Sequence, residues 1–197
     1  MSTTVSKTRD MLVDVARQLF ARMGVDNTTM NDIAQASNKG RRTLYTYFKS
    51  KNEIYLAVVE SELNRLYQML LDVAGRDLPA DEKLITFIYT RLDAVKSIVF
   101  RNGTLRANFF RDIWRVEKVR KNFDLKETNI IKDILDDGVK EGVFSMPDTD
   151  VTAIVLHHCI KGLEVPYIRG LLGDNIRQRI RRRDNVMNLI FNGIKIK

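Results

Sequence analysis

The sequence predicts an all-α fold, and three observations support this prediction. Apolar residues recur at spacings of three and four along most of the chain, which is the pattern of helices with one buried face. Only three prolines occur in 197 residues. Runs of alternating Val, Ile and Thr, which would indicate strands, are missing. The length suits one large domain, or a small domain joined to a medium one.

The composition indicates a basic protein with enough apolar residues for a core. The chain carries a net charge of +8, and 44% of its residues are hydrophobic. No stretch approaches the roughly 18 consecutive apolar residues of a membrane-spanning helix, so a membrane protein is not expected. Residues 1–10 lack the apolar segment of a secretory signal, so the protein is expected in the cytoplasm. The single cysteine, Cys159, excludes an internal disulfide framework and a cysteine-based zinc cluster.

The first expected helix precedes Gly24, a residue type at which helices commonly end. Its apolar face recurs with helical spacing and consists of Met11, Leu12, Val15, Ala16, Leu19, Phe20 and Met23. A second, short helix begins at a predicted capping box, in which Thr29 and Asp32 each bond the other's backbone amide. It ends near Asn38, because Asn tolerates the left-handed conformation of a sharp turn. A third short helix is expected from Gly40 to Tyr47, with Leu44 pointing inward.

A long helix is expected from a second capping box, Ser50 to Glu53, to about Gly75. Further segments with helical periodicity follow Pro79 and predict a bundle. These segments lie at roughly 81–100, 104–115 and 125–141, with Gly142 as a stop.

The last two expected helices, at 148–168 and about 174–194, predict a homodimer. The first of them has apolar stripes on two nearly opposite sides, so it has to be covered on both. One of these stripes and part of the final helix are expected to pack on a second copy of the chain. The sequence leaves open which stripe does so. The candidate interface residues are Val151, Val155, Leu156, Ile160, Leu163, Ile180, Met187 and Ile190.

The segment from Ala36 to Lys51 is strongly cationic. It has five basic residues and no acidic one, and three aromatic residues are interleaved with them. This pattern is the electrostatic footprint of a partner lined with phosphates, although a charge run by itself is usually a solvated surface. The missing acidic residues, and the two short helices joined by a tight turn, favour the phosphate-binding interpretation.

Several separated motifs in residues 10–60 resemble the DNA-binding region of tetracycline-repressor-type (TetR family) transcriptional regulators. The matching positions are AlaArgGlnLeuPhe at 16–20, Gly24, ThrThrMetAsnAspIleAla at 28–34, ThrLeuTyrThrTyrPhe at 43–48, Lys51 and Glu53. The resemblance implies a helix-turn-helix DNA-binding domain at 1–51. It also implies a ligand-binding and dimerisation domain at 52–197, built as a helical bundle.

The resemblance further implies which residues touch DNA. They are Thr29, Lys39, Gly40, Arg41, Arg42, Thr43, Tyr45, Tyr47 and Lys51. Arg41 and Arg42 are the candidates for base contact, because a guanidinium can bond guanine O6 and N7 together. Thr29, Tyr47 and Lys51 are the candidates for phosphate contact. The turn departs from the family pattern at Ser37, Asn38 and Lys39, and the recognition helix departs from it at Gly40 and Arg42. The operator sequence of a relative therefore does not predict the operator of this chain.

An apolar pocket in the C-terminal bundle is the expected site of a small-molecule effector. The candidate lining residues are Tyr67, Phe87, Phe109, Phe110, Trp114 and His158. Ordinary core packing explains each of them as well, and His158 on an apolar face is more often a core histidine than a ligand. His157 and His158 are adjacent and point about 100° apart on a helix, so they cannot share one metal ion. No metal and no cofactor are expected.

The predicted function is that of a ligand-responsive, DNA-binding transcriptional regulator, expected to be a repressor, that binds a quasi-palindromic operator as a homodimer. The partners are double-stranded DNA, a partly apolar effector and a second copy of the chain. One alternative is a helical interaction module whose basic face binds an acidic protein. The other is an enzyme, which is disfavoured because no acid–base constellation or nucleophile motif occurs.

Overall fold

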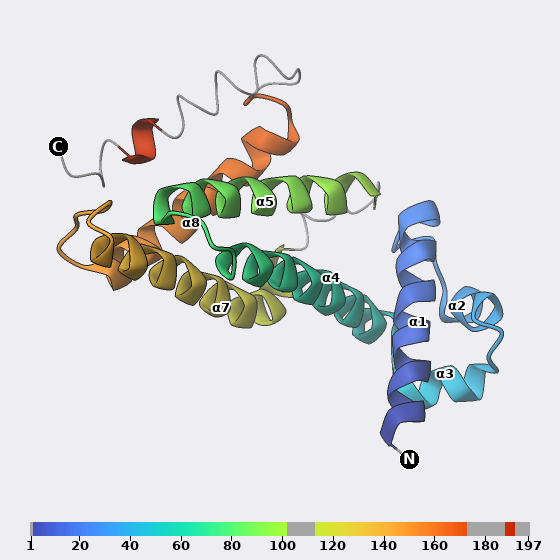
Figure 1. Ribbon diagram of the computed structural model, residues 1–197. Helices are drawn as coiled ribbons and strands as arrows, with labels where there is room; N and C mark the ends of the chain where they lie inside the picture. Colours follow the sequence, from blue (N-terminus) through green and yellow to red (C-terminus); the bar gives the residue numbers. More distant parts are fainter. Residues whose placement is uncertain (1, 102–112, 173–187, 192–197) are drawn as a thin grey trace. The chain divides into compact units, whose positions relative to one another are not determined.

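The structure is a computed structural model that describes residues 2–101, 113–172 and 188–191 (Figure 1). The helices are α1 (Ser2–Met23), α2 (Met30–Ala36), α3 (Arg41–Tyr47), α4 (Lys51–Ala74), α5 (Ala80–Arg101), α7 (Ile113–Lys140) and α8 (Thr149–Ile168). No strand occurs in these ranges, which confirms the all-α prediction. None of the described helices has the length and apolar character needed to cross a membrane.

The chain divides into two compact units. The first contains Met1–Arg65 and Ser97–Lys121, and the second contains Leu66–Lys96 and Asn122–Lys197. The expected domain boundary between residues 51 and 52 falls at the first turn of α4, inside the first unit. The division into a DNA-binding and a ligand-binding domain at that boundary therefore stays a prediction.

The first unit has a hydrophobic core shared by α1, α2, α3 and the beginning of α4. Its fully buried members include Leu12, Phe20, Ile33, Leu44, Phe48 and Ile54. The four residues that hold the helix-turn-helix together, Ile33, Ala34, Leu44 and Phe48, are all buried. The apolar face of α1 packs inward as its spacing predicts.

The second unit is a bundle formed by the end of α4 with α5, α7 and α8. The core includes Leu70 of α4, Leu84, Phe87 and Ile88 of α5, Ile131 and Leu135 of α7 and Ile160 of α8. Helix α7 begins at Ile113, well before the expected start near residue 125, because Val116, Val119 and Phe123 continue the helical spacing. Most of the segment expected at 104–115 and of the helix expected at 174–194 lies outside the described residues.

Helix α8 corrects several expectations about its two apolar stripes. Leu156 and Ile160 are buried within their own chain, so their assignment to the dimer interface is wrong. Val151 and Val155 are more than half exposed, and Leu163 is half-buried. Helical periodicity alone could not distinguish the two stripes. Ile180 and Met187 lie outside the described residues, while Ile190 is described and half-buried.

The two adjacent histidines lie in different environments. His158 is exposed, so its interpretation as a core histidine is wrong, while His157 is buried. Of the candidate pocket residues, Phe87 is fully buried in the core and Tyr67 is half-buried. Trp114 lies in the first turn of α7, and Phe109 and Phe110 lie outside the described residues. The effector pocket stays a prediction.

The last turn of α7 has a close contact that predicts a stability effect. A Cβ atom at Gly138 would lie 2.1 Å from Cδ2 of the buried Phe144 ring. Gly138→Ala is therefore expected to lower the free energy of unfolding by about 1–3 kcal/mol, as overpacking does in cores. Urea unfolding checks this.

Gly75→Ala is the matched control for this substitution. Its new Cβ would meet its nearest atom, the Leu71 carbonyl oxygen, at an ordinary 3.5 Å. The control is expected to change the stability by less than about 0.5 kcal/mol. Equal stability of the Gly138→Ala and Gly75→Ala proteins would contradict the packing at Phe144.

Candidate nucleic-acid interface

Helix α2 begins at a complete capping box, as the sequence predicts. The Thr29 hydroxyl accepts a hydrogen bond from the Asp32 backbone N–H at 3.1 Å. The Asp32 carboxylate in turn accepts from the Thr29 backbone N–H and from the Thr29 hydroxyl, both at 2.8 Å. Both donors of Thr29 are therefore used inside the motif. This places Thr29 as the residue that fixes the start of α2.

The capping box makes a prediction about acid stability. The hydrogen bond from the Thr29 backbone, followed by that from its hydroxyl, holds the pKa of Asp32 below its ordinary value of 3.8. A carboxyl group with a lower pKa in the folded state stabilises the fold above the unfolded value, and this contribution is lost as the pH falls through the folded value. We expect an NMR titration to place the pKa of Asp32 below 3.8, and Thr29→Ala to raise it.

Thr46→Ala is the control for the Asp32 titration. The Thr46 hydroxyl also makes a local hydrogen bond, to the Arg42 carbonyl at 3.0 Å, but it is not part of the capping box. The pKa of Asp32 is expected to stay unchanged in this variant. A wild-type pKa at or above 3.8 would contradict the capping-box geometry.

The turn between α2 and α3 explains why this chain can depart from the family's pattern. Asn38 takes a left-handed conformation with φ of 51°, as expected for the residue that replaces glycine. The Asn38 N–H donates to the Gln35 carbonyl and the Lys39 N–H donates to the Ala34 carbonyl, each at 3.0 Å. These two bonds are those of a Schellman motif, which satisfies the last carbonyls of α2. Lys39 thus joins the turn through its backbone, and its side chain stays exposed.

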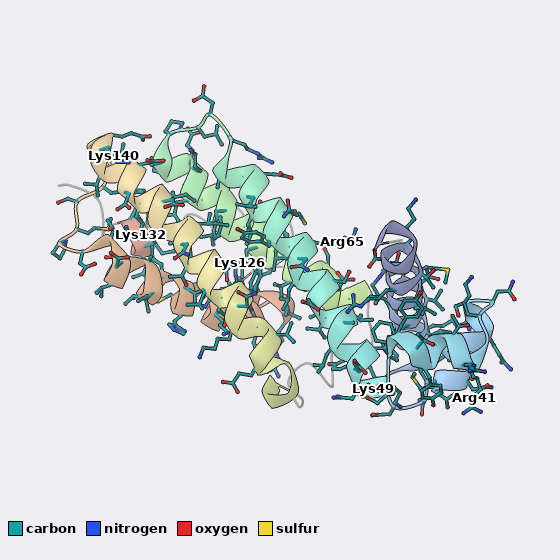
Figure 2. All side chains as sticks on the ribbon, turned by 90° about the horizontal axis from the view of Figure 1, so that it is seen from below. Arg41, Lys49, Arg65, Lys126, Lys132 and Lys140 are labelled. Carbon is teal, nitrogen blue, oxygen red and sulfur yellow. The ribbon has the colours of Figure 1, made fainter. Side chains whose placement is uncertain are left out.

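Helix α3 is held by one buried side chain and has an exposed cationic side. Leu44 is fully buried, whereas Arg41, Arg42 and Tyr45 are exposed. The Arg41 side chain can be followed in Figure 2. Arg41 and Tyr45 lie one turn apart and share a side of the helix. In the part of the chain that the structure describes, neither Arg41 nor Arg42 has an ion-pair partner, so their guanidinium groups are available to a ligand.

The remaining predicted contact residues lie on α3 or close to its ends in the sequence. Gly40 is the N-cap residue, and a Cβ atom there would meet nothing within 4 Å. Thr43 and Tyr47 are half-buried, and Lys39 and Lys49 are exposed. The structure therefore brings Lys39, Gly40, Arg41, Arg42 and Tyr45 together on one surface, which we call the α3 surface.

Lys51 has a structural bond that the sequence did not predict. Its ammonium donates to the Val25 carbonyl at 2.8 Å and to the Asp26 carbonyl at 3.1 Å. These bonds tie the first turn of α4 to the loop after α1. One of the three ammonium donors is left for a phosphate. The loss of Lys51 would consequently affect the stability of the unit as well as any DNA contact.

The start of α4 differs in one bond from the expected capping box. The Glu53 N–H donates to the Ser50 hydroxyl at 3.2 Å, as expected. The Glu53 carboxylate, however, accepts from the Lys49 N–H at 2.6 Å. The backbone N–H that the Glu53 carboxylate accepts from is therefore that of Lys49, one residue before the Ser50 that the sequence pattern implies. A second contact missed by sequence reasoning places the Arg9 guanidinium 5.3 Å from the centre of the Phe48 ring.

Two short helices joined by a tight turn, with a cationic and acid-free second helix, define a helix-turn-helix DNA-binding protein. Comparisons with known proteins agree with this class. A family model described as "Bacterial regulatory proteins, tetR family" matches residues 12–58. The transcriptional repressor KstR2 of Mycolicibacterium smegmatis is 30% identical over 154 residues, which cover 74% of this chain and 71% of the relative. The chain belongs to the TetR family of transcriptional regulators.

Two further similarities extend over nearly the whole chain. The probable acrEF/envCD operon repressor of Escherichia coli is 26% identical over 191 residues, which cover 93% of this chain and 86% of the relative. A solved structure of a regulator from Saccharomonospora viridis in complex with choline superposes with a TM-score of 0.72 at 20% identity, covering 98% of this chain and 100% of that one. This likeness shows that the two chains share a fold.

Proposed function

We propose that this regulator is a ligand-responsive repressor that binds a quasi-palindromic operator as a homodimer. The observation that supports the DNA-contact assignment is the α3 surface. Its arginines are exposed and have no ion-pair partner within the described part of the chain, while the buried side chain of Leu44 anchors α3 in the core. A short, rigid, cationic helix is the element that helix-turn-helix proteins place in the major groove.

The proposed contacts fall into two groups. Arg41 and Arg42 bond base edges, where each two-pronged guanine contact contributes about 1–3 kcal/mol of discrimination. Lys39, Tyr47 and the third donor of Lys51 bind phosphates. Gly40, Thr43 and Tyr45 line the same groove surface. Thr29 supports the contacts indirectly, because its two donors are used by Asp32.

The proposed homodimer uses the exposed stripe of α8. Val151, Ile154 and Val155 are 56%, 51% and 54% exposed. Three neighbouring aliphatic side chains that are exposed to this extent are typical of an interface. A two-fold dimer would present two copies of α3 to successive major grooves, about 34–36 Å apart or a multiple of that distance.

The proposed effector binds in the predicted ligand-binding domain, residues 52–197. The choline complex of a regulator with the same fold supports a small-molecule site, although the ligand of this chain need not be choline. Of the predicted lining residues, Tyr67, Phe87 and the exposed His158 belong to the second unit, and they are the ones proposed here. An effector that prefers one of two states by 1–3 kcal/mol would change operator affinity roughly 5–150-fold. The proposal includes no catalytic step.

Selection of bound duplexes from a random pool tests this proposal. We expect the recovered sequences to show two-fold symmetry and a half-site spacing near one helical turn or a multiple of it. The logarithm of the binding constant should fall with the logarithm of salt concentration, with a slope of about −0.9 per neutralised phosphate. Salt-sensitive binding without sequence preference would instead favour the alternative of an acidic protein partner.

Arg41→Ala should relax the base preference at one position of each half-site. The expected loss of discrimination is about 1–3 kcal/mol, because the guanidinium bonds the base edge. The control is Lys39→Ala, which should weaken binding to all duplexes about equally and reduce the salt slope by about one per half-site. Repeating the selection with both variants checks this. Identical effects of the two substitutions would contradict the division between base and phosphate contacts.

A further inference from the structure

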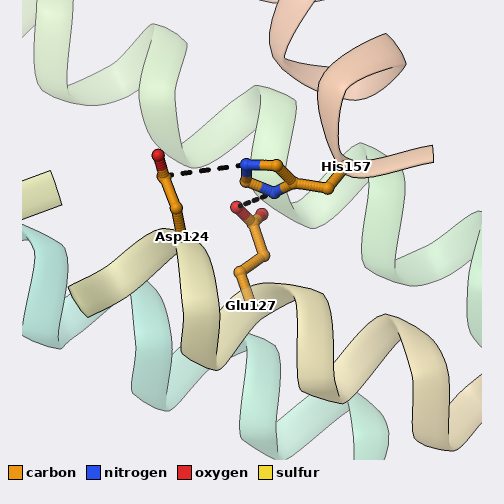
Figure 3. Close-up of side chains that lie close together, drawn as sticks. All are labelled: Asp124, Glu127 and His157. Carbon is orange, nitrogen blue, oxygen red and sulfur yellow. Dashed lines mark ion pairs between the residues drawn. The ribbon is translucent and has the colours of Figure 1, made fainter. Parts of the chain in front are cut away.

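The bundle of the second unit contains a cluster of ionisable side chains that the DNA-binding function does not use. Asp124 and Glu127 are three residues apart on α7, so they lie on one side of that helix. His157 of α8 faces both of them, as Figure 3 shows. Its Nδ1 atom lies 3.1 Å from Glu127 Oε2, and its Nε2 atom lies 3.8 Å from Asp124 Oδ1. The imidazole therefore lies between two carboxylates.

Neighbouring cations fix both carboxylates in this orientation. The Lys161 ammonium donates to Asp124 Oδ2 at 2.7 Å. The Arg91 Nε–H donates to Glu127 Oε1. Each carboxylate thus has one oxygen held by a cation and presents its other oxygen to His157. Partners of this kind orient the ligands of metal sites.

A neutral imidazole does not satisfy both carboxylates in this arrangement. A neutral imidazole has one N–H and one lone pair, and here each nitrogen faces a carboxylate oxygen. Whichever nitrogen carries the lone pair is therefore repelled by an anion. His157 is 3% exposed and Glu127 is 0% exposed, so water screens the repulsion poorly. A metal cation bound between the imidazole and the carboxylates would remove it.

We infer that Asp124, Glu127 and His157 bind a divalent first-row transition-metal ion. Donor atoms of the three residues all lie within 4.8 Å of one another. Both ring nitrogens of His157, and the oxygens Asp124 Oδ1 and Glu127 Oε2 that face them, are buried and make no hydrogen bond to any described residue. These four atoms are therefore available as ligands.

The donor set indicates the class of ion. One imidazole nitrogen and two carboxylate oxygens suit Zn²⁺ and similar ions, whose bonds to these atoms are about 2.0–2.2 Å. Two such bonds at a right angle span about 3.0 Å, which is close to the 3.1 Å between His157 Nδ1 and Glu127 Oε2. Asp124 is 22% exposed and offers the ion a route from solvent. Mg²⁺ prefers oxygen donors in an octahedral shell and fits poorly.

Little in the sequence indicated this site. A single cysteine and two adjacent histidines argue against a motif on one helix, and no metal was expected. Asp124 and Glu127 do have the spacing of a ligand pair on one helix face, but exposed acidic pairs with this spacing are common. Only the packing of α8 on α7 adds the nitrogen donor.

Calorimetric titration of the full-length protein with Zn²⁺ tests the inference, after treatment with a chelator. The protein carries Cys159→Ser, because Cys159 is exposed and a thiolate is itself a ligand for zinc. We expect one ion per chain, and no heat with Mg²⁺. His157→Gln and Asp124→Asn should each weaken Zn²⁺ binding about 100-fold or more. Co²⁺ should give a visible spectrum that both variants lose.

The matched control is His158→Gln, which removes the exposed neighbour of His157 and should leave Zn²⁺ binding unchanged. Circular dichroism establishes that each variant is folded, and Asp124→Asn alters the least buried of the three residues. Unchanged Zn²⁺ binding in His157→Gln, or none in the parent protein, would overturn the inference. None of these measurements involves DNA, so they are independent of the proposed function.

Discussion

Replacing both Ile154 and Val155 by Asp is expected to convert the proposed dimer into a monomer and to weaken operator binding by about 10²–10⁴-fold. The affinity falls because a dimer makes the second half-site contact intramolecular, and a monomer loses this advantage. The two side chains are 51% and 54% exposed, so Asp at these positions does not disturb the chain's own core. In a two-fold interface each new carboxylate would also lie near its copy on the partner.

Sedimentation measures the oligomeric state, and titration of a labelled operator measures the affinity. Leu71→Asp is the control, because Leu71 is a 37%-exposed apolar residue on α4 and lies outside the α8 stripe. This control should stay dimeric and keep its operator affinity. A double variant that remains dimeric would contradict the proposed interface, and a monomer with unchanged operator affinity would contradict binding as a dimer.

Arg91→Met is expected to lower the free energy of unfolding by about 3–5 kcal/mol, the usual cost of removing one partner of a buried ion pair. The Arg91 guanidinium bonds Glu127 and lies 2.8 Å from Glu164 Oε1. Arg91 is 1% exposed and the two glutamates are also buried. Burial alone would lower the pKa of Arg91, but the charges of Glu127 and Glu164 outweigh it and raise the pKa. Methionine removes the guanidinium from beside the two buried carboxylates.

Urea unfolding at neutral pH, with a chelator present, measures this loss. The control is Lys132→Met, which removes the cation of a partly exposed pair: Lys132 Nζ lies 2.7 Å from Asp136 Oδ2, and the two side chains are 31% and 33% exposed. Its expected effect is at most about 0.5 kcal/mol. Adding Glu127→Gln and Glu164→Gln to Arg91→Met should recover part of the stability, because no unpaired charge remains. An Arg91→Met protein as stable as the Lys132→Met control would contradict the buried cluster.

The N-terminal unit could be predicted closely because its signals are local. The Thr29 and Asp32 bonds, the Asn38 turn and the Ser50 cap each join residues no more than five positions apart. Such contacts depend on residue type and spacing, which the sequence displays directly. The exposed side of α3 could be predicted in the same way, because Leu44 is the only apolar residue in the first turn of that helix, Arg41 to Leu44.

The sequence by itself determined the helical class, the helix-turn-helix and the cationic character of its second helix, since these depend on periodicity and on neighbours a few residues apart. The tertiary structure alone decided which stripe of α8 is covered, and so placed Leu156 and Ile160 inside while leaving Val151 and Val155 outside. It also paired Arg91 with Glu127, 36 residues away, and turned His157 toward α7. A helix with two apolar stripes satisfies its own periodicity in either orientation, and only the packing of neighbouring helices selects one.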